Sequence, residues 1–162
     1  RCSDMHAFEG NVMVATDLNT IEWRAAGTPG AGGYGTAHGM AAFYQMLLAG
    51  GVLNGTRILS PRVIQFASRN HTDDRVDHGM GMPMHRGIGP HVRGYTPTIR
   101  GLGTIAWPST YGHGGVGTSY SWADPESDVS FSYISNCMAP EPWHTVRLDK
   151  ISNLAHASIV EL

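Results

Sequence analysis

The sequence predicts an α+β fold, in which an antiparallel sheet is flanked by helices. Three observations support this class. Apolar residues recur at helical spacing in 37–49 and again in 144–160, and between them residues 119–135 alternate small polar with aromatic or aliphatic side chains. An amphipathic helix laid on an antiparallel sheet buries the apolar face of both elements.

The first 35 residues give weak signals. Asn11–Thr16 has the composition of a short strand, and Gly27–Gly35 is a glycine-rich loop. Thr36 then has the side chain of a helix N-cap, directly before the apolar residues of 37–49. We therefore expect the first well-defined helix to follow Thr36.

Two further signals define the next elements. Asn54 and Gly55, flanked by short apolar pairs, predict a tight hairpin turn. Ser60 and Pro61 combine an N-cap residue with proline in the first turn, which predicts a second helix over about 60–69. Residues 70–106 show no long periodic pattern, which is typical of a functional or disordered loop.

A β-hairpin follows, with strands at 119–123 and 129–135 joined by a turn at 124–127. Its apolar face is predicted to comprise Tyr120, Trp122, Val129, Phe131 and Tyr133. The closing helix over 144–160 carries an apolar stripe that suits this face.

Length and composition indicate one domain over 1–162, with a helical and loop region in 1–106 and the hairpin and closing helix in 107–162. The chain has 11 Lys and Arg against 13 Asp and Glu, which argues against a nucleic-acid partner. No apolar run is long enough to cross a membrane. No targeting segment is visible, which favours the cytoplasm.

The most specific string is YGHGGVG, which begins at Tyr111. Gly114 and Gly115 would let a ligand approach the backbone closely, and the N–H of Val116 would then be placed to stabilise an oxyanion. The imidazole of His113 could donate a hydrogen bond or move a proton. On local spacing alone, a tight start of a strand with a structural histidine explains the string equally well.

The chain also contains nine histidines. His71, His78, His85 and His91 recur at intervals of seven, seven and six, but no short metal-binding spacing is present. We therefore expect solvated loop histidines, no metal site and no cofactor. A histidine-rich metal-binding module remains the weakest of the alternatives.

The run YGHGGVGTSYSWADPESDVSFSYISN resembles the C-terminal motif region of the serine β-lactamase, penicillin-binding-protein and esterase superfamily. It is most similar to esterase-type members, in which an H-G-G triplet replaces the K-T-G triplet of the β-lactamases. The stretch GTPGAGGYGTAHGMAAFYQMLLAGGVLNGTRILSPRVI resembles the family segment that precedes this motif. Together the resemblance covers about residues 24–71 and 101–136.

The resemblance implies the C-terminal portion of a β-lactamase/DD-peptidase-like fold, an acylated serine in S-x-x-K, and a triplet strand that lines the pocket. Carried over by position, it implies catalytic roles for His113 and Val116, and substrate-binding roles for Tyr111, Gly114, Gly115 and Gly117. The substrate would be a small ester or amide. Because an imidazole is mostly neutral at pH 7, we expect uncharged esters to be preferred over penicillins.

The sequence departs from the family at the nucleophile. Its single lysine, Lys150, lies in the closing helix, and no S-x-x-K occurs. Ser68 and Tyr133 begin S-x-N and Y-x-S strings, but both lie in the wrong elements. We therefore interpret the chain as a partial domain, the C-terminal part of a longer serine hydrolase whose N-terminal part supplies Ser and Lys. The alternative is a truncated or degenerate member that binds a ligand or partner without acylation.

Two expectations follow for the isolated chain. It should form no acyl-enzyme, because on a continuous strand Ser119 would lie too far from His113. Its sheet should lack neighbouring strands, so that an exposed edge and uncovered apolar residues promote association. The residues expected to be uncovered are Tyr120, Trp122, Phe131 and Tyr133.

Overall fold

The structure is a computed structural model. It describes residues 20–30, 32–96, 101–115, 117, 119–135 and 142–160. The strand expected at Asn11–Thr16 lies outside this part of the chain. Within it, no helix is long and apolar enough to cross a membrane.

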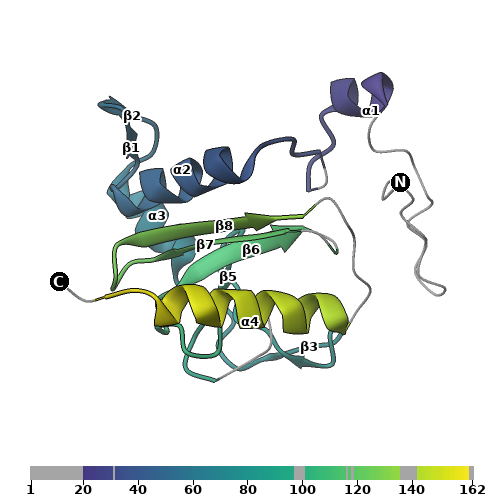
Figure 1. The fold of residues 1–162 in the computed structure, drawn as a ribbon, viewed down its shortest axis with the longest axis vertical. Coiled ribbons are helices and arrows are strands. Elements are labelled where there is room, and N and C mark those ends of the chain that lie inside the picture. The colour runs from purple at the N-terminus through teal and green to yellow at the C-terminus, as the bar shows by residue number, and fades with distance from the viewer. Residues whose placement is uncertain are drawn as a thin grey trace.

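A four-stranded antiparallel sheet lies between two helical layers (Figure 1). Its strands follow the order β5-β6-β7-β8, with bounds His91–Val92, Tyr111–Gly115, Ser119–Asp124 and Val129–Ile134. Helix α2 covers one face and helix α4 the other (Figure 1). This arrangement confirms the α+β class and the antiparallel sheet flanked by helices.

Four helices and two small hairpins complete the described fold. The helices are α1 (Ile21–Ala26), α2 (Ala37–Leu48), α3 (Pro61–Ser68) and α4 (Trp143–Ala157). The hairpins pair β1 (Val52–Leu53) with β2 (Thr56–Arg57), and β3 (Val76–Asp77) with β4 (Met82–Pro83). The expected helices at 37–49, 60–69 and 144–160 are therefore present, each within three residues of its predicted bounds.

Side-chain caps explain where the helices begin. The amide of Gly39 donates to the Thr36 hydroxyl at 3.0 Å, and the amide of Val63 donates to Ser60 at 3.2 Å. Thr20 caps α1 in the same way, a helix that the sequence analysis did not predict. With six residues and no buried side chain, α1 is too short to show an apolar stripe.

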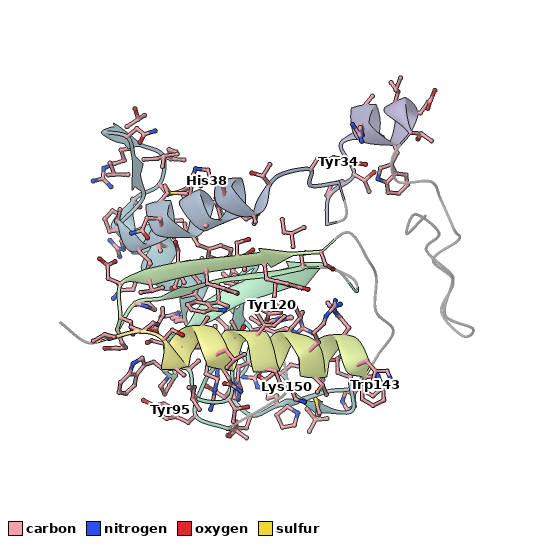
Figure 2. All side chains as sticks on the ribbon, viewed as in Figure 1. Tyr34, His38, Tyr95, Tyr120, Trp143 and Lys150 are labelled. Atoms are coloured by element: carbon pink, nitrogen blue, oxygen red, sulfur yellow. The ribbon has the colours of Figure 1, made fainter. Side chains whose placement is uncertain are left out.

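The face of the sheet that α4 covers holds one apolar core. Leu102, Tyr120, Trp122 and Leu148 are buried there, and Phe131 and Tyr133 pack against them. Tyr120 lies between the sheet and α4 in Figure 2. The expectation that these aromatic side chains are uncovered is therefore wrong, because α4 and the segment around Leu102 cover them.

The opposite face carries a second core beneath α2. It is formed by Tyr44, Val92, Tyr111 and Ala123, with Met40, Leu47 and Leu48 packed against them. Because β5 supplies Val92 and β6 supplies Tyr111, the long segment 70–106 belongs to the same sheet as the H-G-G strand. This pairing brings the irregular segment next to the candidate site.

One histidine of that segment corrects the sequence analysis. His85 is buried, with its Nδ1 2.9 Å from the Arg93 carbonyl and its Nε2 2.8 Å from Asp74. The hydrogen bond from His85 holds the pKa of the Asp74 carboxyl below its usual range. His85 is therefore a structural residue that ties the loop together, and not a solvated loop histidine.

Candidate functional site

Strand β6 carries the H-G-G triplet through the centre of the sheet. His113 is exposed, and its Nδ1 lies 2.7 Å from the carbonyl oxygen of Gly114. Because a carbonyl only accepts, Nδ1 must carry the proton, and in the neutral ring Nε2 keeps a lone pair. The ring can therefore accept a hydrogen bond or a proton from a ligand through Nε2.

The glycine at the centre of the triplet is required by close packing. An added Cβ at Gly114 would lie 2.6 Å from Cδ2 of Tyr120 and 2.8 Å from the carbonyl oxygen of Ser119. Tyr120 is the direct partner of Gly114 in the β6–β7 ladder, so its ring lies across the position that a side chain would take. The strand can thus pass directly over the α4-side core.

Among the described residues, no strand pairs with the β5-side edge of β6 beside the triplet. On the β5 side, the ladder pairs His91 with Gly112 and Val92 with Tyr111, and it stops there. His113 to Gly115 extend beyond this pairing while remaining bonded to β7 on the other side. An open strand edge is able to pair with an extended ligand through backbone hydrogen bonds.

A hollow of about 400 Å³ lies on the α2 side of this strand. Its lining combines the loop before α2, α2 itself and strands β6 to β8: Gly33, Tyr34, Gly35, Met40, Tyr44, His113, Gly114, Gly115, Ser119, Ser121 and Ile134. Figure 2 shows Tyr34 in the segment that leads into α2, on the side of the sheet away from α4. The hollow thus joins three of the predicted site residues, His113, Gly114 and Gly115, to the glycine-rich loop.

A second cavity of about 300 Å³ shares its wall with the first. Tyr44 and His113 line both hollows. The second is lined almost wholly by apolar side chains from α2, α3 and the loop at 88–90, and Tyr111 also lines it. Tyr111 is itself buried in the α2-side core, so its predicted role in substrate binding would be confined to this apolar cavity.

The turn between β6 and β7 changes one part of the sequence analysis. His113 and Ser119 do not share a continuous strand, because Gly117 adopts a φ of +72° and the chain reverses there. Ser121 is therefore the direct partner of His113 in the ladder. The distance argument against a Ser–His pair on this hairpin was wrong.

Ser121 is nevertheless poorly placed as a nucleophile. It is only 3 % exposed, and its hydroxyl is 2.8 Å from the hydroxyl of Ser132 on β8. Ser119 is partly exposed and lines the larger hollow, but it faces Gly115 and Ile134 across the sheet. Neither hydroxyl has a hydrogen bond to His113 among the described contacts.

The two other titratable side chains that could act as bases, Tyr44 and Lys150, are not suited to replace the lysine of the family motif. Burial raises the pKa of the Tyr44 hydroxyl to about 12, so it stays protonated at neutral pH. Lys150 is exposed on α4, on the other side of the sheet from Tyr34 (Figure 2). Among the described contacts, no base is hydrogen-bonded to a serine hydroxyl of this site, and the Ser121 hydroxyl is bonded to that of Ser132.

Val116, the predicted oxyanion donor, lies outside the described residues. Its neighbour Gly117 is described, and the Arg147 guanidinium of α4 donates to the Gly117 carbonyl at 3.2 Å. The same guanidinium lies over the ring of Tyr133. Helix α4 therefore anchors Gly117 in the connection between β6 and β7.

Several site residues were missed by the sequence analysis. His91 of β5 packs against His113 with the two rings tilted, their centroids 4.5 Å apart and their planes at 33°. The two residues are 22 positions apart, and a two-residue strand within an irregular segment leaves no signal of its pairing. Tyr34 was predictable only as part of a glycine-rich loop.

Among the described residues, no group of three His, Cys, Asp or Glu side chains is arranged to hold a metal ion.

Two solved structures illustrate what this fold is similar to. EstA from Arthrobacter nitroguajacolicus Rue61a aligns with a TM-score of 0.65 at 23 % identity, covering 89 % of this chain and 38 % of that one. A penicillin-binding-protein homologue from Caulobacter crescentus aligns with a TM-score of 0.59 at 27 % identity, covering 76 % and 32 %. The first match shows the fold alone, and the second adds sequence similarity.

Two proteins of Mycobacterium tuberculosis are similar in sequence. Esterase/beta-lactamase LipL is 30 % identical over 108 residues, which cover 67 % of this chain and 23 % of LipL. Protein Rv1367c is 31 % identical over 117 residues, covering 65 % and 28 %. The chain thus spans about a quarter of the length of these relatives. The Beta-lactamase family itself matches over residues 5–155, and the chain therefore belongs to the Beta-lactamase family of hydrolases.

Proposed function

We propose that this chain forms one wall of the active site of a serine hydrolase that cleaves uncharged esters. The observation that carries the proposal is the H-G-G strand. His113 is exposed, no strand of the described residues pairs with the edge beside it, and two hollows adjoin it. An ester lying along this edge would meet backbone donors and acceptors on β6. The N–H of Val116 is proposed to contribute one donor to the oxyanion hole.

The preference for esters rests on charge. A triplet that begins with lysine presents a permanent cation to a substrate carboxylate, whereas a neutral imidazole does not. In this structure the proton on Nδ1 is directed at the Gly114 carbonyl, so Nε2 presents a lone pair to the ligand. A lone pair repels a carboxylate and tolerates a neutral acyl ester.

The nucleophile and its base are proposed to come from an N-terminal part of the same protein. Relatives that match this chain are about four times as long as the matching stretch. The apolar cavity beside His113 has large hydrophobic side chains at its rim, since Phe43 is 45 % exposed, Val63 52 % and Ile88 58 %. Apolar surface of this kind favours a covering segment, and a segment seated there would lie next to His113.

The test uses the protein expressed together with the polypeptide that its upstream coding region encodes. Turnover of a nitrophenyl butyrate ester and of the β-lactam nitrocefin would be compared at neutral pH. The proposal predicts at least tenfold higher kcat/KM for the ester, and a smaller ratio in His113→Lys, which restores a permanent cation. Equal turnover of the two substrates, or an unchanged ratio in His113→Lys, would contradict it.

A further inference from the structure

A chain of contacts leads from an ion pair on the surface to the imidazole of the triplet. Arg86 Nη2 lies 2.8 Å from Asp77 Oδ2, and Arg86 Nη1 lies 3.1 Å from His91 Nε2. The His91 ring in turn packs against the His113 ring in a tilted arrangement, with centroids 4.5 Å apart. None of Asp77, Arg86 and His91 belongs to the triplet or to its own strand.

The hydrogen-bond chemistry of this chain assigns the proton of His91. A guanidinium has only donors, so Nε2 of His91 must be the acceptor. The proton of the ring is then on Nδ1, which lies 3.3 Å from the hydroxyl oxygen of Tyr120 and donates to it. A second proton on His91 would remove the acceptor that Arg86 uses and place an imidazolium beside a guanidinium.

Arg86 is itself held in place. The hydrogen bond from Arg86 lowers the pKa of the Asp77 carboxyl, whose other oxygen accepts the amides of Gly79 and Met80 at 2.9 and 3.0 Å. The backbone amide of Arg86 also donates to the Thr72 hydroxyl at 2.9 Å. Because Asp77 is ionised, its negative charge balances the positive charge of Arg86.

We propose that Arg86 and His91 are positioning residues for His113. Arg86 holds His91 as the neutral Nδ1–H tautomer, and the His91 ring, packed against the ring of His113, then keeps the Nδ1–H of His113 on the Gly114 carbonyl. Nε2 of His113 is thereby kept as the acceptor in the site. The catalytic meaning of this arrangement rests on the proposed function, whereas the arrangement itself is a property of the chain.

The test is nitrogen NMR of the complete chain labelled with ¹⁵N-histidine, in which long-range ¹H–¹⁵N correlations identify the protonated nitrogen of each ring. We expect Nδ1–H tautomers for both His91 and His113. Arg86→Met should turn His91 into an exchanging mixture of tautomers, and Arg86→Lys, which keeps a donor and a charge, should restore the single form. Arg57→Met is the matched control, because Arg57 binds only the carbonyls of Gly50 and Leu59 among the described contacts.

A second pair of variants tests the contact between the His91 and His113 rings and leaves Arg86 intact. His91→Ala should release His113 into a mixture of tautomers, and His91→Phe, which keeps a flat ring, should restore the Nδ1–H form. An Nε2–H tautomer of His113 in the unmodified chain would overturn the proposal, as would a His113 signal that His91→Ala leaves unchanged. Because no turnover is measured, these results stand or fail independently of ester hydrolysis.

Discussion

Replacing Gly114 with alanine tests how closely the triplet strand is packed. The new Cβ would lie 2.6 Å from Cδ2 of Tyr120 and 2.8 Å from the Ser119 carbonyl oxygen, distances at which neighbouring atoms must move. The Tyr120 ring has little room to withdraw, because it is 5 % exposed and also lies close against Gly101. Forced overpacking of this kind costs about 1–3 kcal/mol of unfolding free energy.

Thermal unfolding followed by tryptophan fluorescence is the assay. For a chain of this size the cost corresponds to a decrease in Tm of about 2–12 °C. Gly35→Ala is the matched control, because a Cβ at Gly35 meets nothing within 4 Å, and we expect its Tm to be unchanged or slightly raised. If the Gly114→Ala chain had the same Tm as the unmodified chain, the packing argument would be refuted.

Three further predictions concern buried polar groups. Ser152→Ala removes the hydroxyl that accepts the Trp122 indole N–H at 3.0 Å, and urea unfolding should show a loss of about 1–3 kcal/mol. Burial favours the neutral form of Asp124, but hydrogen bonds from neighbouring donors outweigh it and lower its pKa. Asp124 therefore contributes stability that is present above pH ~4 and is lost as the pH falls through its lowered pKa. In Asp124→Asn, the midpoint of urea unfolding should decrease less between pH 6 and pH 2 than it does in the unmodified chain. Burial raises the pKa of Tyr44 and Tyr111 to about 12, so stability should fall from pH ~10 upward, and ultraviolet titration should show both phenols ionising later than exposed tyrosines.

Local chemistry made much of the fold predictable. Thr36 and Ser60 cap their helices through side-chain hydrogen bonds between residues three positions apart, and such contacts depend on few other parts of the chain. The turn at Asn54 likewise forms where the sequence predicted it, with Asn54 at a φ of +49°. The alternation in 119–135 predicted the β7–β8 hairpin because one face of it packs against α4.

The site was less predictable because its parts are distant in sequence. A ladder of only two residue pairs brings His91 to His113, and the loop that carries His91 is held by contacts such as that of buried His85 with exposed Asp74. The reversal at Gly117 placed Ser121, and not Ser119, across from His113. A glycine two positions after the triplet is the signal from which this turn was predictable.

The most direct test of the account is whether the 162-residue chain acylates. The chain would be incubated with a fluorophosphonate probe and its intact mass measured, beside the same protein extended by its upstream coding region. We predict no adduct on the chain alone, since Ser121 is buried and no base lies at hydrogen-bond distance from a reachable serine of the described site. In the extended protein we predict one adduct on a serine outside these residues. A stoichiometric adduct on Ser68, Ser119 or Ser121 of the chain alone would contradict the account.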